Sequence, residues 1–362
     1  MFSMSVNYSH QSPIDLQGKG LVGLLDNSNG YDVDRYPWAY AAWKRQQQIH
    51  WVGEEVPLGE DIKDWNSTRL TQEEHNLLMH IFRFFTQSDI EVSDNYFKRY
   101  IPIFQPLELQ MMMAAFTNME TVHIDAYALL LKTLGIPKSE FRAFRDYDSM
   151  RMKADYMHEF GINTCADVAR TLAMFGAFTE GMSLFASFAM LMNFPRFNKM
   201  KGMGQIVSWS IRDESLHCES VIRLYHEWAQ ETGAVTQSVE DDIIEVGKKM
   251  VSLEDKFVDL AFELGTVEGM TAHDIKSYVR YICDWRLTQL KLTPVYGYFA
   301  GKAGEYTKVK EHPLPWLSSL LNGVEHANFF EARATEYSKA ATRGEWHGAD
   351  SVWHAFDSKV RK

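Results

Sequence analysis

One apolar segment limits the folds that are open to this chain. Residues 171–194, TLAMFGAFTEGMSLFASFAMLMNF, carry a single charged side chain, Glu180, near the centre of the segment. A carboxylate in such surroundings must be protonated, paired or bound to a cation, because an unpaired charge away from water costs more free energy than one helix can supply. The fold must therefore provide a partner for Glu180.

A membrane-spanning helix is one explanation for this segment, since such a helix needs about 20 apolar residues. However, the segment contains Glu180, threonine, serine and two glycines, and Pro195 and the basic sequence RFNKMKG follow it directly. The chain contains no second comparable run. A helix buried in the core of a large soluble protein is the better prediction, with no membrane partner.

Composition excludes several classes of function. The chain has 362 residues, of which 46% are hydrophobic, enough for a large core. A net charge of −11 and the lack of a block of lysine and arginine argue against a nucleic-acid partner. Cys165, Cys218 and Cys283 are widely spaced in apolar segments, which predicts thiols without a disulfide framework. No secretory signal is visible at the N-terminus, so we expect a cytoplasmic protein.

Helix start and stop signals divide the chain into long helices joined by short turns. Capping boxes predict helix starts at Thr71 with Glu74, Thr164 with Asp167, Ser238 with Asp241, and Thr271 with Asp274. Pro106 predicts a further helix that stops at Gly135, and Pro195 predicts the end of the apolar helix. Another helix is expected over roughly residues 205–230, ending near Gly233. Because almost no alternation of period two is present, we predict an all-α fold in one domain.

Two of the 13 histidines follow a glutamate by three residues inside predicted helices. These are Glu120 with His123, in ETVH, and Glu214 with His217, in ESLH. Residues i and i+3 share one face of a helix, so each pair can present a carboxylate oxygen and an imidazole nitrogen to the same point. A single pair would be weak support for a metal site, because glutamate and histidine at this spacing are common on helix surfaces.

Two lone carboxylates in apolar helices strengthen the case for a metal site. Glu180 is the first, and the second is on the helix that starts near Thr71, where Asp89, Glu91 and Asp94 are candidates that periodicity does not separate. Four helices that donate two single carboxylates and two Glu-x-x-His pairs are the arrangement of di-iron and di-manganese carboxylate bundles. Carboxylates can bridge two ions, and imidazole suits iron or manganese. We therefore favour a dinuclear metal site over buried polar groups that only pair with one another.

Tyr127 lies on the same helix face as the first pair, four residues after His123 and seven after Glu120. Taken alone, it is explained by core packing with a satisfied hydroxyl. Next to a dinuclear oxidising site it is a candidate for one-electron oxidation. Leu184 and Phe188 share the face of Glu180 and could shield a reactive species, and they are equally well explained as core residues.

At these residues the sequence resembles the small, radical-generating subunit of class I ribonucleotide reductase. The resemblance covers roughly residues 35–341, including the segments RYPWAYAAWKRQQQIHWVGEEVPL, IFRFFTQSDIEV, NMETVHIDAY, FGAFTEGMSLFASFAML, FPRFNKMKGMGQIVSWSIRDESLHCES and FFEARATEYSKAA. It implies a ferritin-like helical bundle with a dinuclear metal-carboxylate site in its core. The implied activity is that of a ribonucleoside-diphosphate reductase, an oxidoreductase that works with a large catalytic subunit.

The resemblance also implies a ligand set. The spacing from Asp89 to Glu120 matches the family, which selects Asp89 over Glu91 and Asp94. The implied ligands are Asp89, Glu120 and His123 at one metal ion and Glu180, Glu214 and His217 at the other, with bridging carboxylates. The two ions in each chain would be iron, manganese or one of each. Tyr127 falls on the position of the radical tyrosine.

A relay to the large subunit is implied by further matches. Trp51 matches the relay tryptophan, Asp213 matches the acid that links it to His123, and Tyr337 matches a tyrosine of the mobile C-terminal segment. The relay would serve the reduction of ribonucleotides to deoxyribonucleotides. Candidate anchors for a docking peptide at the C-terminus are Trp346, Trp353 and Phe356.

We expect three parts: residues 1–34 as an irregular N-terminal segment, residues 35–335 as the radical-generating domain, and residues 336–362 as a flexible tail that docks the large subunit. A homodimer is also expected. Two alternatives use the same ligands. A stand-alone dinuclear oxidase or monooxygenase would need a substrate pocket beside the metal ions and no relay, and a ferritin-like storage protein would bind metal without forming a radical.

Overall fold

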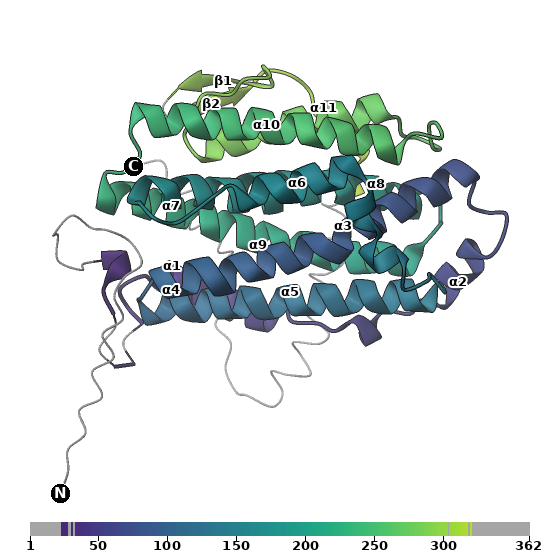
Figure 1. Ribbon diagram of the computed structural model, residues 1–362, viewed down its shortest axis with the longest axis horizontal. Helices are drawn as coiled ribbons and strands as arrows, with labels where there is room; N and C mark the ends of the chain where they lie inside the picture. The colour runs from purple at the N-terminus through teal and green to yellow at the C-terminus, as the bar shows by residue number, and fades with distance from the viewer. Residues whose placement is uncertain (1–22, 28–29, 32, 303, 318, 321–362) are drawn as a thin grey trace, which may run out of the picture. The chain divides into compact units, whose positions relative to one another are not determined.

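The structure is a computed structural model that describes residues 23–27, 30–31, 33–302, 304–317 and 319–320. The chain divides into two compact units, Met1–Leu314 and Pro315–Lys362. All the helices and strands given below belong to the first unit (Figure 1). The expected boundary between residues 335 and 336 lies outside the described residues.

Helices account for nearly all the regular structure of the first unit, as the sequence predicts. The α-helices are α1 (Pro37–Gln48), α2 (Gly59–Trp65), α3 (Gln72–Asn95), α4 (Ile101–Ile103), α5 (Leu107–Thr133), α6 (Asp148–His158), α7 (Cys165–Leu172), α8 (Leu184–Arg196), α9 (Lys201–Thr232), α10 (Gln237–Ala261) and α11 (Ala272–Gln289). Short 3-10 helices are η1 (Gly23–Leu25), η2 (Gly53–Glu55) and η4 (Glu140–Asp146), and π-helical segments are η3 (Tyr96–Tyr100) and η5 (Ala173–Ser183).

Three of the four predicted capping boxes are confirmed. At Thr71, Thr164 and Thr271 the threonine hydroxyl accepts a hydrogen bond from the backbone N–H three residues later, and the acid there accepts from the threonine N–H. The prediction at Ser238 is wrong, because α10 begins at Gln237 after an extended Thr236. The side chain of Gln237 donates to Asp241 one turn later, and this bond supports the earlier start.

The apolar segment with Glu180 forms one continuous helix, made of α7, η5 and α8. By length and composition Cys165–Arg196 could cross a membrane, but its most apolar window is entirely buried inside the protein. The prediction of a buried core helix is therefore confirmed. The helix ends one residue after Pro195 rather than before it, since a proline in the last turn removes only one helical hydrogen bond.

The long helices lie side by side in the first unit (Figure 1). Helix α3 packs on α5, η5 packs on α9, and α5 also contacts α9. These four elements carry all six candidate metal ligands. Helix α3 also contacts η5, so the four elements pack around a common core. Gly176 allows η5 to approach α9 closely, because a Cβ atom at this position would lie 2.4 Å from Cγ1 of Val221.

A short antiparallel hairpin of β1 (Phe299–Lys302) and β2 (Glu305–Lys308) was not expected from the sequence. Phe299 pairs with Lys308, and Lys302 pairs with Glu305. Gly301 and Gly304 have positive φ angles of 135° and 89°, which glycine adopts without strain. The glycines of FAGKAGEYTK are the sequence signal for this turn, although strands of four residues show too little alternation to predict.

The close contact at Gly176 generates a test of the packing. Gly176→Ala should lower the free energy of unfolding by about 1–3 kcal/mol, because overpacking outweighs the gain of about 0.5–1 kcal/mol in helix propensity. Thermal unfolding followed by circular dichroism measures the change. Gly59→Ala is the control, since nothing lies within 4 Å of a Cβ atom there. Equal midpoints for the two variants would contradict the packing described.

Candidate metal centre

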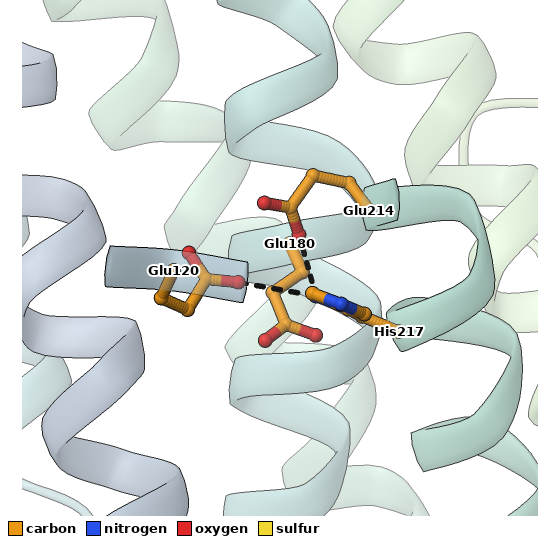
Figure 2. Close-up of side chains that lie close together, drawn as sticks. All are labelled: Glu120, Glu180, Glu214 and His217. Carbon is orange, nitrogen blue, oxygen red and sulfur yellow. Dashed lines mark ion pairs between the residues drawn. The ribbon is translucent and has the colours of Figure 1, made fainter. Parts of the chain in front are cut away.

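Four helical elements bring a cluster of buried acids and imidazoles to one point. Figure 2 shows Glu120 from α5, Glu180 from η5, and Glu214 and His217 from α9 with their polar ends directed toward one another. One ligand atom from each of these four residues lies within 4.8 Å of the others. All four side chains are buried.

His123 and Asp89 belong to the same cluster. Nδ1 of His123 lies 3.5 Å from Oε2 of Glu120 and 3.3 Å from Oε1 of Glu214. Asp89 is buried, and the charges of Glu120, His123 and Glu214 all act on its carboxyl group. The structure therefore brings together the six side chains that the sequence analysis selected.

The polar atoms of the cluster converge without satisfying one another. Nδ1 of His217 lies 3.1 Å from Oε1 of Glu120 and 3.6 Å from Oε2 of Glu214, yet neither contact has hydrogen-bond geometry. Several buried atoms at this point have no hydrogen-bond partner among the residues that the structure describes: Oδ2 of Asp89, both carboxylate oxygens of Glu120 and of Glu214, and Nδ1 of His217. Buried polar atoms are normally paired, so this set fits cations at their common centre.

The charges lead to the same conclusion. Burial and the charge of Glu120 raise the pKa of Asp89 well above its usual range, and burial and Glu214 do the same for Glu180. Burial also acts to raise the pKa of Glu120, but His123 and His217 outweigh it and lower this pKa to about 2. Four carboxylates therefore cannot all ionise together on their own. Two divalent cations would balance the four negative charges.

A different buried acid shows how this core compensates a single charge. Oε1 of Glu254 lies 2.5 Å from Nζ of Lys153 and accepts a hydrogen bond from the hydroxyl of Ser183. In the cluster, by contrast, Glu120 and Glu214 face imidazoles and other carboxylates. The cluster is therefore not an ordinary buried ion pair.

In both imidazoles the outer nitrogen, Nε2, which is the one that points away from the cluster, contacts a polar side chain. Nε2 of His123 lies 3.2 Å from Oδ2 of Asp213, and Nε2 of His217 lies 3.0 Å from Oε1 of Gln46. The amide of Gln46 also donates to Oδ1 of Asp213, at 3.4 Å. With the proton on Nε2 in each ring, the Nδ1 lone pairs point into the cluster, which is the usual way that an acid or carbonyl orients a metal-binding histidine. The sequence analysis missed Gln46, since nothing in the segment KRQQQIHW separates it from its neighbours.

Trp51 is joined to the cluster through Asp213. Its Nε1 donates to Oδ2 of Asp213 at 2.7 Å, the same oxygen that lies beside His123. Trp51 is buried, and the ring of the partly exposed Trp209 lies 5.1 Å from it, centroid to centroid. A continuous line of contacts therefore leads from His123 toward the surface.

Tyr127 is buried close to Asp89. Its hydroxyl donates to Oγ of Ser210 at 3.4 Å, and Ser210 in turn donates to the backbone carbonyl of Ile206. The ring lies 4.8 Å from that of Phe85, which contacts Phe188. Burial raises the pKa of Tyr127, so its hydroxyl is protonated at neutral pH.

The structure separates the three acids that periodicity left open on α3. Glu91 lies 3.2 Å from Nε2 of His158, and Asp94 pairs with Lys98 on the surface. Asp89 alone of the three is buried next to the cluster. Four predicted residues lie outside the described part of the chain: Tyr337, Trp346, Trp353 and Phe356.

A helical bundle whose core holds two Glu-x-x-His pairs and two further carboxylates defines the class of ferritin-like dinuclear carboxylate proteins. The family described as ribonucleotide reductase, small chain, matches residues 32–299. This chain belongs to that family. The enzyme that contains such a small chain, ribonucleotide reductase, is an oxidoreductase.

Individual relatives agree with this assignment. The chain is 36% identical to the probable ribonucleoside-diphosphate reductase small subunit of Invertebrate iridescent virus 6, over 92% of this chain and 99% of the viral one. Among solved structures, the ribonucleotide reductase R2 subunit from Clostridium botulinum matches 86% of this chain and 98% of its own with a TM-score of 0.73 at 20% identity. The dimanganese(II)-NrdF of Streptococcus sanguinis matches 75% and 93% with a TM-score of 0.62 at 19% identity. These two structures support the fold.

The position of Asp89 gives a test of the cluster. Asp89→Asn should weaken the binding of one of two metal ions at least tenfold, because an amide cannot supply the negative charge. Burial raises the pKa of Asp89 and so favours its neutral carboxyl, which an uncharged amide resembles in size and shape, so the variant should still fold. Metal analysis after anaerobic loading measures the loss.

The control for this test is Asp94→Asn, which changes an exposed acid on the same helix. It should bind both ions. Equal metal content in Asp89→Asn and Asp94→Asn would remove Asp89 from the ligand set.

Proposed function

We propose that this chain is the radical-generating small subunit of a ribonucleoside-diphosphate reductase. Two metal ions held by the cluster would, when bound, supply the oxygen activation that takes one electron and one proton from Tyr127. The chain stores the oxidising equivalent on Tyr127 and delivers it to a large catalytic subunit, which reduces ribonucleotides to deoxyribonucleotides for DNA synthesis. Membership of the small-chain family supports this proposal.

The observation that best supports the metal proposal is that two carboxylates each lie between the two imidazoles and contact both. Glu120 and Glu214 each turn one oxygen toward Nδ1 of His123 and the other toward Nδ1 of His217, at 3.1–3.6 Å. A carboxylate in this position can bridge two ions. Asp89 and Glu180 complete the two positions, with Asp89, Glu120 and His123 at one and Glu180, Glu214 and His217 at the other.

The donor set suits more than one metal. Carboxylate and imidazole ligands accept both iron and manganese, and selection between them depends on geometry and availability. The Streptococcus sanguinis relative is named for two manganese ions. We propose iron, manganese or one of each at this centre.

The surroundings of Tyr127 suit a stored radical. The ring is buried against Phe85, and Leu184 and Phe188 are buried in the same core, which keeps solvent reductants away. The Ser210 hydroxyl is the hydrogen-bond acceptor that faces the phenol. This bond orients the phenolic O–H, and because a serine hydroxyl is not a base, the proton would leave together with the electron to the metal centre when the ions are bound.

The contacts of Trp51 support a role in transfer. Its indole N–H and Nε2 of His123 both contact Oδ2 of Asp213. A single carboxylate oxygen therefore connects the Trp51 ring to a metal-binding imidazole, which is a short path for an electron and its proton. We propose Trp51, Asp213 and Tyr337 as the residues that pass the oxidising equivalent on. Residues 336–362 would dock the large subunit, residues 35–335 would hold the radical-generating domain, and residues 1–34 would form an irregular N-terminal segment.

The assembly proposed is a cytoplasmic homodimer that binds the large subunit and neither nucleic acid nor a membrane. The net charge of −11 and the burial of the apolar helix favour this assignment. A stand-alone oxidase would need a substrate pocket beside the ions. Two pockets among the described residues, one beside Tyr156 and Arg170 and one beside Trp38 and Arg223, include no cluster residue.

The radical assignment is tested with Tyr127→Phe. After anaerobic metal loading and exposure to oxygen, the wild type should show a tyrosyl radical in electron paramagnetic resonance. Tyr127→Phe should lose this signal while retaining both metal ions, because only the oxidisable hydroxyl is removed. Tyr278→Phe changes another buried tyrosine, on α11, and should keep the signal. An unchanged signal in Tyr127→Phe would refute the assignment.

The relay is tested with Trp51→Phe in the presence of the large subunit. Ribonucleotide reduction should fall at least a hundredfold, about 2.7 kcal/mol in the barrier, while the metal content and the radical remain. Trp228→Phe is the control, since Trp228 is a buried tryptophan whose N–H donates to the backbone carbonyl of Cys165. Reduction at the wild-type rate in Trp51→Phe would exclude this relay.

A further inference from the structure

A second buried tyrosine touches the metal centre from the side of η3. The hydroxyl of Tyr96 donates a hydrogen bond to Oε2 of Glu180 at 3.0 Å, and its side chain is completely buried. Among the described residues, both oxygens of Glu120 and of Glu214 lack a hydrogen-bond partner. Glu180 therefore differs from these two carboxylates, because a side-chain hydroxyl occupies one of its oxygens.

The Tyr96 ring is held firmly enough to direct this hydroxyl. It makes edge-on contacts with three rings, those of Tyr100, Phe116 and His217, at centroid distances of 5.7, 5.9 and 6.2 Å. Both partners of the hydrogen bond lie in π-helical segments, Tyr96 in η3 and Glu180 in η5. Such segments are rare in proteins and are frequent at functional sites.

We propose that Tyr96 is a positioning residue of the metal centre, which holds the Glu180 carboxylate in one orientation and makes the two metal positions unequal. This inference rests on the metal centre of the proposed function. The phenol occupies Oε2 of Glu180, so Oε1 is the oxygen left to face a metal ion. No hydroxyl in the described part of the chain holds Glu120 or Glu214 in the same way, which leaves both side chains able to turn toward either ion.

The expected effect of losing this bond follows from two opposing contributions. Without the phenol, Glu180 would bear more negative charge on its oxygens, which favours a cation. It would also be free to rotate, so metal binding would have to fix its orientation. Replacing a partner that orients a metal ligand typically lowers metal affinity about 10–100-fold, so the loss of orientation is the larger contribution.

The test is an anaerobic titration with Mn(II) of the full-length wild type and of Tyr96→Phe. Free Mn(II) is followed by electron paramagnetic resonance, which gives the affinity of each position without an activity assay. The wild type should bind two ions per chain. Tyr96→Phe should bind one ion as the wild type does and the second about 10–100-fold more weakly.

Tyr100→Phe is the matched control. Tyr100 is four residues along the same segment, is equally buried, and donates its hydroxyl to the backbone carbonyl of Thr171 rather than to an acid. Both variants lose one buried hydroxyl, so thermal unfolding of the metal-free proteins should shift to a similar extent. Tyr100→Phe should bind both ions with wild-type affinity, whereas equal weakening in both variants would show a general structural effect and overturn the proposal.

A double variant separates the role of Tyr96 from the centre itself. If Tyr96 acts through Glu180, adding Tyr96→Phe to Glu180→Ala should change the remaining affinity less than twofold, and a further tenfold loss would overturn the proposal. Wild-type protein that failed to bind two ions would refute the metal centre of the proposed function. Two ions bound equally by the wild type and Tyr96→Phe would refute only the role of Tyr96.

Discussion

The mutual repulsion of four buried carboxylates is the constraint on which the rest of this structure depends. Asp89, Glu120, Glu180 and Glu214 come from different helical elements and meet where burial raises the pKa of two of them. A core can compensate one such charge internally, as Lys153 does for Glu254. Two imidazoles cannot compensate four ionised carboxylates, so all four acids can carry their charge together only when cations are bound at their centre.

The surrounding helices serve to hold these charges in place. Gly176 lets η5 approach α9, and the π-helical turns at η3 and η5 carry the two partners Tyr96 and Glu180. On the opposite side of the imidazoles, Gln46 and Asp213 hold the outer nitrogens. Within the described part of the chain, the oxygens of Glu120 and Glu214 and Nδ1 of His217 have no hydrogen-bond partner, whereas the outer nitrogens do, and this asymmetry is typical of a site built for metal ions.

Local patterns in the sequence predicted local structure well. The capping boxes at Thr71, Thr164 and Thr271 mark real helix starts, because the hydrogen bonds of a cap span only three residues. At Ser238 the same rule failed, since α10 begins at Gln237, whose side chain donates to Asp241, the acid that the predicted box assigned to Ser238. The hairpin was missed because its strands are too short to show a period.

The sequence by itself determined the helical class, the two Glu-x-x-His pairs and the need of Glu180 for a partner, since each depends on spacing along one helix or on the cost of a buried charge. Its resemblance to a known family selected Asp89. Only the tertiary structure decided which oxygen faces which nitrogen, that Gln46 joins His217 to Asp213, and that Tyr96 binds Glu180. These contacts join residues 84 to 171 positions apart in the chain, and no local pattern specifies which distant side chains will meet.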